Sequence, residues 1–216
     1  MCIRDRSTSY GTLSGDLSDL DGLRQTIRAV APDLIVNAAA YTAVDKAETE
    51  QELARKLNAL ASGVIAEEAK RLDALFVHYS TDYVFDGAGT SPWKESDSVS
   101  PVNYYGATKL EGEQLIVASG CKHLIFRTSW VYAARGNNFA KTMLRLAKER
   151  QILNIIADQI GVPTSAELLA DVAVHAVQKT LNNPSLCGIY HLAPAGETSW
   201  HCLLYTSDAA DEEDSV

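Results

Sequence analysis

Apolar runs alternate with helical patterns along most of this chain, and that alternation is the feature that most restricts its fold. The run Leu75–Tyr79 is short and apolar, as is typical of a strand buried in a parallel sheet. Further strands are predicted at Leu34–Ala40, His123–Ser129, Gln151–Ala157 and Ile189–Leu192, and helices at about Glu50–Arg71, from Tyr105 to about Ser119, and at Asn138–Arg150 and Ala166–Leu181. This order predicts an α/β fold with a doubly wound parallel sheet.

The composition is that of an ordinary globular chain, because 46% of the 216 residues are hydrophobic and 22% are charged. The net charge is −9, and no basic patch suggests nucleic acid as a partner. Neither a membrane-spanning stretch nor a signal peptide is apparent, so a cytoplasmic protein without a membrane partner is expected. The four cysteines lack the spacing of a zinc site, and no metal site is predicted.

Tyr105 and Lys109 are the strongest chemical signal in the sequence. They are four residues apart in a predicted helix, so that both side chains can point into one pocket. A nearby ammonium favours the phenolate, so we expect Lys109 to lower the pKa of Tyr105 and make it a proton donor. Thr81 lies just beyond the strand Leu75–Tyr79, at the sheet edge where open α/β folds bind ligands. Together the three side chains suit carbonyl reduction with a nicotinamide cofactor.

A glycine-rich turn is missing from the beginning of the sequence. Such a turn normally joins the first strand of a dinucleotide-binding sheet to a helix whose N–H groups hold the pyrophosphate. Residues 1–14 contain Gly11 alone and no apolar strand before it. Either the cofactor is held in another way or the chain is truncated.

Several motifs in order resemble the dTDP-4-dehydrorhamnose reductase family of the extended short-chain dehydrogenase/reductase superfamily. The resemblance runs from about Gly15 to His201, through Asn37–Asp45, the Thr81 segment, Tyr105–Lys109, Arg127–Tyr132, Gly136–Phe139 and Asp158–Thr164. It implies an incomplete Rossmann-like doubly wound parallel sheet with part of a smaller substrate-binding domain.

The resemblance also divides the chain into regions. Residues 1–14 are expected to be a mostly non-native leader, 15–150 a partial NAD(P)-binding Rossmann domain, 151–201 a mixed Rossmann and substrate-binding region, and 202–216 a non-native tail. We therefore expect a fragment that lacks an upstream glycine-rich loop and a longer downstream domain. Whether the printed chain is active by itself stays open.

The resemblance implies the reduction of dTDP-4-dehydro-L-rhamnose to dTDP-L-rhamnose by NADPH or NADH, as part of cell-surface polysaccharide synthesis. Tyr105 would be the general acid, and Lys109 would lower its pKa and hold the nicotinamide ribose. Thr81 would bind the substrate carbonyl. The residues expected to contact the cofactor are Asp16, Leu17, Ala39, Ala40, Thr42, Tyr105 and Lys109.

Three residues are expected around the sugar, and each has a purely structural alternative. Val44 could be core, Tyr83 could pack on the sheet, and Trp130 could bridge two domains. Three other polar residues are interpreted as structural: Asn138 as a helix N-cap, Arg127 as half of a buried ion pair and His78 as a core histidine.

Two other functions fit the same motifs. An extended short-chain epimerase or dehydratase would use the same tyrosine and lysine but retain its cofactor, and a noncatalytic NADP-binding regulatory subunit, like that of methionine adenosyltransferase, would lack turnover. The resemblance also allows Mg²⁺ and a homodimer in a full-length member, with the magnesium ligands outside this chain.

Overall fold

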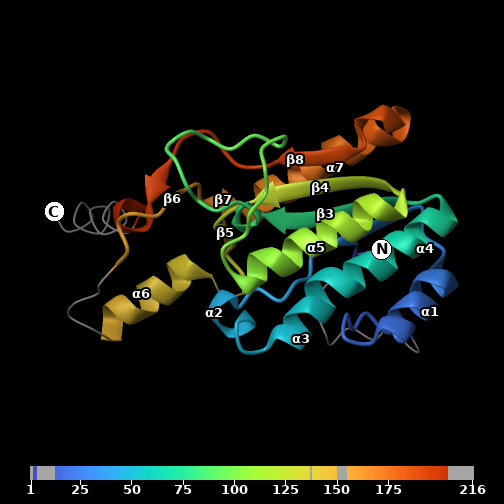
Figure 1. Ribbon diagram of the computed structural model, residues 1–216, viewed down its shortest axis with the longest axis horizontal. Coiled ribbons are helices and arrows are strands. Elements are labelled where there is room, and N and C mark those ends of the chain that lie inside the picture. The colour runs from blue at the N-terminus through green and yellow to red at the C-terminus, as the bar shows by residue number, and fades with distance from the viewer. Residues whose placement is uncertain (1, 4–12, 137, 150–154, 204–216) are drawn as a thin grey trace. The chain divides into compact units, whose positions relative to one another are not determined.

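The computed structural model describes residues 2–3, 13–136, 138–149 and 155–203. The chain divides into two compact units, the first formed by residues 1–127 and 173–191 and the second by residues 128–172 and 192–216. Helix α7 (Ala166–Asn182) begins in the second unit and ends in the first. The predicted α/β class is confirmed (Figure 1).

The first unit is built on a five-stranded sheet. The strands follow the order β1 (Cys2–Ile3), β2 (Leu34–Asn37), β3 (Leu75–Thr81), β4 (Lys122–Thr128) and β8 (Gly188–His191). The pairs β1/β2, β2/β3 and β4/β8 are parallel, as the alternation of strands and helices predicts. The register places Asn37 beside His78 and Arg127 beside His191, so the side chains of each pair emerge on the same face of the sheet.

Three helices cover one face of this sheet: α1 (Leu20–Val30), α4 (Ala61–Leu72) and α5 (Tyr104–Ser119) (Figure 1). Their apolar stripes meet the sheet in one core, as the 3.6-residue period requires. Fully buried members of this core are Leu23, Ile27, Ile35, Ile65, Phe76 and Ile116. The short helices α2 (Val44–Ala47) and α3 (Gln51–Arg55) lie between β2 and α4 in the sequence.

The ends of α5 are fixed by its own sequence. Asn103 is the N-cap, and its side-chain oxygen accepts a hydrogen bond from Gly106 N at 2.7 Å. Gly120 ends the helix in the left-handed conformation, at φ 65°. A side chain at Gly112 would meet the Asn58 carbonyl oxygen at 2.5 Å, so glycine is needed there for the close approach of α5 to its neighbour.

The predicted helix from Glu50 to Arg71 is present but is not regular. The π-helical turn η1 (Lys56–Leu60) separates α3 from α4. Such turns are rare and often occur near functional sites. Apolar spacing does not reveal a single wider turn, because the residues on both sides keep a helical period.

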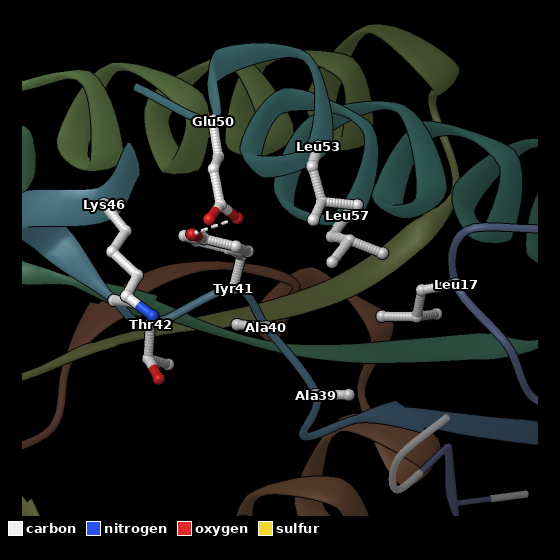
Figure 2. A pocket seen from close by; sticks show the side chains of 10 residues that line it. Leu17, Ala39, Ala40, Tyr41, Thr42, Lys46, Glu50, Leu53 and Leu57 are labelled. Atoms are coloured by element: carbon white, nitrogen blue, oxygen red, sulfur yellow. Dashed lines mark hydrogen bonds between the residues drawn. The ribbon is translucent and has the colours of Figure 1, made fainter. Parts of the chain in front are cut away.

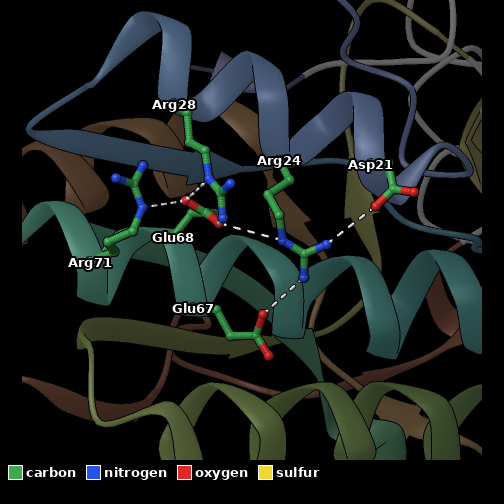
Figure 3. Close-up of polar contacts among 6 residues, drawn as sticks. All are labelled: Asp21, Arg24, Arg28, Glu67, Glu68 and Arg71. Carbon is green, nitrogen blue, oxygen red and sulfur yellow. Dashed lines mark hydrogen bonds and ion pairs between the residues drawn. The ribbon is translucent and has the colours of Figure 1, made fainter.

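Glu68 of α4 joins its helix to α1 through Arg24 and Arg28, and it also pairs with Arg71 of its own helix (Figure 3). Its carboxylate is buried and lies 2.6 Å from Arg28 Nη2, 2.7 Å from Arg71 Nε and 3.4 Å from Arg24 Nε. The hydrogen bond from Arg28 is the main cause that holds the pKa of Glu68 below its ordinary value of 4.5. The neighbouring Glu67 is exposed and contacts Arg24 alone among these arginines.

We expect Glu68→Gln to destabilise the protein by about 1–2 kcal/mol at neutral pH, because charged hydrogen bonds to a buried carboxylate are lost. Since the folded-state pKa is lowered, this contribution is complete above the ordinary glutamate value of 4.5 and disappears as the pH falls through the folded value. Urea unfolding at pH 7 and pH 3 measures both effects. Glu67→Gln is the matched control and should change stability by less than about 0.5 kcal/mol. Equal effects of the two variants would contradict this role of Glu68.

In its described part, the second unit contains short strands, helix α6 and the beginning of α7. Strand β5 (Val131–Tyr132) pairs in parallel with β7 (Thr164–Ser165), and β6 (Ile160–Gly161) pairs antiparallel with β9 (Thr198–Ser199). Helix α6 (Phe139–Glu149) begins after Asn138, whose side chain accepts from Lys141 N at 3.0 Å, so the N-cap interpretation is confirmed.

Trp130 is half-buried and packs within the second unit. Its ring stacks on Trp200 with centroids 3.6 Å apart, and a side chain at Gly161 would come within 2.5 Å of it. The backbone of Trp130 has φ 44°, in the left-handed region that bulky residues rarely adopt.

Two predicted strands differ from the structure. The strand expected at Leu34–Ala40 ends at Asn37, and the next residues form a loop. In the strand expected at Gln151–Ala157, residues 151–154 lie outside the described residues and residues 155–157 form no strand. Ile156 in that segment is 55% exposed, so its apolar character does not mark a buried element.

Candidate active site

Thr81 and Tyr105 meet at the carboxyl end of β3. Thr81 is buried, caps the 3-10 turn η2 (Asp82–Val84) and shares a side-chain hydrogen bond with Tyr105. Its hydroxyl also donates to Asp82 Oδ1 at 3.1 Å and accepts from Tyr83 N at 3.2 Å. The structure therefore brings together a hydroxyl and a phenol that are far apart in the sequence.

The pKa of Tyr105 differs from the sequence expectation. Burial raises it to about 12, and the charge of Asp82 adds to the rise, while the hydrogen bond to Thr81 opposes it. The predicted lowering by Lys109 is wrong for the chain by itself, because burial outweighs the other influences on the phenol. Tyr105 consequently keeps its proton throughout the physiological pH range.

Lys109 is four residues after Tyr105 on α5 and is fully buried. Its ammonium donates to the Tyr79 carbonyl oxygen at 2.6 Å, and Nζ lies 3.1 Å from His78 Nε2. Burial lowers the pKa of Lys109 to about 8, against the opposing charge of Glu113. A lysine with such a pKa changes its charge within an experimentally accessible range.

A buried ion pair joins α5 to strand β4. Arg127 Nη2 lies 2.7 Å from Glu113 Oε2, and Arg127 Nε donates to Oε1 at 3.0 Å, so the interpretation of Arg127 as an ion-pair partner is confirmed. Ser80 Oγ donates to Glu113 Oε1 at 2.5 Å. Among the described residues, Nη1 of Arg127 has no hydrogen-bond partner.

A pocket of about 400 Å³ opens beside β2 and the helices that follow it (Figure 2). Of the predicted cofactor residues, Leu17, Ala39, Ala40 and Thr42 line it. Its other lining residues are Tyr41, Ala43, Lys46, Glu50, Leu53 and Leu57. Asp16 is adjacent in the sequence to this lining, and its carboxylate accepts from Ser18 N at 2.8 Å. The volume lies within the range of roughly 300–1,000 Å³ that is usual for ligand pockets.

Asn58 holds the pocket loop, and sequence reasoning missed it. Its side chain accepts from Tyr41 N at 2.8 Å and donates to Tyr41 O at 3.1 Å. It also donates to Thr108 Oγ1 at 3.0 Å on the helix that carries Tyr105. A buried asparagine inside an apolar helical stretch was the available signal, since such a side chain needs polar partners.

The candidates for sugar binding fall in different places. Tyr83 packs edge-on against Tyr105, with ring centroids 5.8 Å apart. Val44 is half-buried at the start of α2. Trp130 belongs to the second unit, where it stacks on Trp200. Substrate contact by these three residues stays a prediction.

The described residues contain neither a metal-binding cluster nor a membrane-spanning helix. Within them, no group of three or more histidine, cysteine, aspartate or glutamate side chains could hold a metal ion. None of the helices formed by this described part is long and apolar enough to cross a membrane.

Comparison with known proteins gives the family. Residues 4–208 match the family described as the RmlD substrate binding domain. The chain belongs to this family. One relative is the dTDP-4-dehydrorhamnose reductase of Salmonella typhimurium, which is 59% identical to this chain over 187 residues. The matched part is 87% of this chain and 62% of that protein. The enzyme of that name from Escherichia coli K12 is 55% identical over 195 residues, which are 90% of this chain and 64% of that protein.

Solved structures of the RmlD family agree with the fold. The crystal structure of dTDP-4-dehydrorhamnose reductase from Bacillus anthracis, in complex with NADP, has a TM-score of 0.82 at 38% identity and covers 91% of this chain and 68% of that chain. The Rossmann-like class is thereby confirmed. The chain spans 62% and 64% of the lengths of the two curated relatives.

Proposed function

We propose that this protein reduces the C4 ketone of dTDP-4-dehydro-L-rhamnose to give dTDP-L-rhamnose, with NADPH or NADH as the hydride donor. The observation that carries the proposal is the meeting of Thr81 and Tyr105 at the carboxyl end of β3, with the buried Lys109 on the helix that carries Tyr105. The RmlD family relatives named dTDP-4-dehydrorhamnose reductase support the substrate. The predicted cytoplasmic location is part of this proposal.

The residues present fit a nicotinamide dinucleotide in part. The pocket beside β2 is lined by the small side chains Ala39 and Ala40 and by the apolar Leu17, which suits the flat faces of an adenosine. Lys109 would hold the nicotinamide ribose with its ammonium group. The printed sequence contains no glycine-rich turn for the pyrophosphate, so the fit covers the two ends of the cofactor.

When bound, the reduced nicotinamide supplies the hydride that adds to the ketone carbon. Tyr105 then donates its phenolic proton to the oxygen of that carbonyl group, where negative charge develops. Thr81 would orient the same oxygen by turning toward it the hydroxyl proton that points to Asp82 Oδ1 in this structure, and its hydrogen bond with Tyr105 keeps the two hydroxyl groups together. Because the pKa of Tyr105 is raised to about 12, the phenol holds its proton until the oxygen becomes strongly basic.

Turnover with the two substrates tests the proposal. Incubation with NADPH and dTDP-4-dehydro-L-rhamnose should consume the two in equal amounts and give dTDP-L-rhamnose, detected by mass spectrometry. Conversion of a nucleotide sugar without net loss of NADPH would indicate an epimerase or dehydratase instead. Tight NADPH binding without any conversion, together with retention of an enzyme partner in a pull-down, would indicate a regulatory subunit.

We expect Ala39→Leu to weaken NADPH binding roughly tenfold or more, because the larger side chain enters the pocket that Ala39 lines. Calorimetric titration of the 216-residue chain measures this affinity. Ala38→Leu is the matched control, since Ala38 is exposed and is not part of the pocket lining. Unchanged affinity in Ala39→Leu would show that NADPH binds elsewhere.

A further inference from the structure

His78 is a buried titratable residue that the proposed reaction does not use. Its side chain is 1% exposed, and it lies between two polar neighbours. On one side Nε2 is 3.1 Å from Lys109 Nζ, and on the other Nδ1 is 3.4 Å from Asn37 Nδ2. The parallel register of β2 and β3 creates this arrangement, because Asn37 and His78 are paired positions on one face of the sheet.

A neutral imidazole cannot satisfy both neighbours when Lys109 is charged. The amide of Asn37 is oriented by Ala39 N, which donates to Asn37 Oδ1 at 3.1 Å, so its NH₂ group faces His78. An ammonium on Lys109 also presents a proton to the ring, but the ring has one acceptor nitrogen. One of the two contacts must therefore be given up.

The distances show which contact dominates. The contact with Lys109 is 3.1 Å and that with Asn37 is 3.4 Å, and a hydrogen bond from a charged donor is stronger than one from an amide. We propose that His78 is a positioning residue for Lys109, with Nε2 accepting a hydrogen bond from the ammonium and Nδ1 carrying the ring proton. The catalytic meaning of this contact rests on the proposed function, but the contact itself does not.

Loss of a proton from Lys109 should move the ring proton of His78 from Nδ1 to Nε2. A neutral amine can accept from Nε2–H, which frees Nδ1 to accept from Asn37. The tautomer of His78 should therefore switch as Lys109 titrates, with the pKa of Lys109 at about 8. Burial and the charge of Lys109 hold the pKa of His78 well below 6.5, so the ring stays neutral throughout this change.

The other charged groups around this pair can be named. Glu113, on the same helix as Lys109, favours the ammonium and is itself paired with Arg127 from β4. Asp82, from η2, acts on Tyr105. From β2 the facing group is the neutral Asn37. Lys109 is therefore the group of this pair that changes its charge, and His78 is expected to follow by changing its tautomer.

Nitrogen NMR of the 216-residue chain with ¹⁵N-labelled histidine and lysine tests the assignment without any turnover. His78→Phe identifies the signals of His78 by their absence. Below pH 7 we expect a protonated Nδ1 and an unprotonated Nε2, and a switch of tautomer with the same midpoint as the Lys109 signal. A ring that carries its proton on Nε2 from pH 6 to pH 10 would overturn the proposal.

Turnover variants supply the second readout. If the ammonium is the active form, His78→Phe should move the alkaline fall of turnover to lower pH by about one unit, because a hydrogen bond that favours the charged lysine is lost. His78→Gln offers a replacement acceptor and should restore much of the shift. Val77→Ala, in the same strand, controls for lost packing and should leave the profile in place.

The two readouts separate the proposals. If the unmodified chain shows no turnover, that result counts against the proposed function. The NMR measurement would still decide the role of His78, because it does not depend on turnover. If the His78→Phe variant is folded and active but its turnover falls at the same alkaline pH as that of the unmodified chain, the positioning role is contradicted.

Discussion

Replacing Tyr105 by phenylalanine is expected to lower turnover by about 10²-fold or more, because the proton donor is removed while the ring remains. The phenol is the group that shares a hydrogen bond with Thr81, and its pKa of about 12 keeps it protonated at every pH at which turnover would be assayed. Steady-state rates with NADPH and the keto sugar measure the effect. The affinity for NADPH should fall by much less than turnover, because the resemblance gives Tyr105 a contact with the cofactor as well as its role at the substrate carbonyl.

The adjacent Tyr104 provides a matched control. It is half-buried at the first position of the same helix, one residue from Tyr105. Tyr104→Phe should therefore keep normal turnover. Near-normal turnover in Tyr105→Phe, with folding confirmed by circular dichroism, would remove Tyr105 from the mechanism.

Glu113→Leu should cost about 3–5 kcal/mol of stability, the largest loss we expect from a single substitution. It leaves the buried guanidinium of Arg127 without its carboxylate, and Nη1 of that group already has no partner among the described residues. It also removes the acceptor of Ser80 Oγ. Urea unfolding followed by fluorescence measures the loss.

Two further variants make the Glu113 result specific. Glu111 is on the same helix as Glu113 and forms an exposed ion pair with Arg55 of α3, so Glu111→Leu should cost less than about 1 kcal/mol. Adding Arg127→Met to Glu113→Leu should recover most of the stability, since the uncompensated buried charge disappears. A double variant no more stable than Glu113→Leu alone would contradict the view that the unpaired charge causes the loss.

The sequence predicted those parts of the fold that depend on local pattern. The sequence predicted two elements close to their observed bounds, the strand Leu75–Tyr79 and the helix from Tyr105 to Ser119. Both depend on short-range signals, namely a run of apolar residues and the residues that cap a helix. The helix α1 was not predicted, although Asp19 caps it and its apolar residues are buried. The strand expected at Gln151–Ala157 was wrong over its described part, because an apolar run can be exposed.

The candidate site was predictable in its residues but not in its electrostatics. Spacing alone placed Tyr105 and Lys109 on one helix face, and Thr81 after its strand. It could not reveal that Lys109 points to His78 and the Tyr79 carbonyl, because those contacts depend on how the helix packs on the sheet. For the same reason the pKa of Tyr105 was expected to fall, whereas burial raises it.

Transfer of a labelled hydride tests the central claim most directly. The protein would be incubated with dTDP-4-dehydro-L-rhamnose and NADPH that carries deuterium at the transferable position, and the product examined by NMR and mass spectrometry. We predict dTDP-L-rhamnose with one deuterium at C4 and an equal amount of oxidised cofactor. A sugar product without deuterium, or unchanged sugar in the presence of bound NADPH, would contradict the proposed reduction.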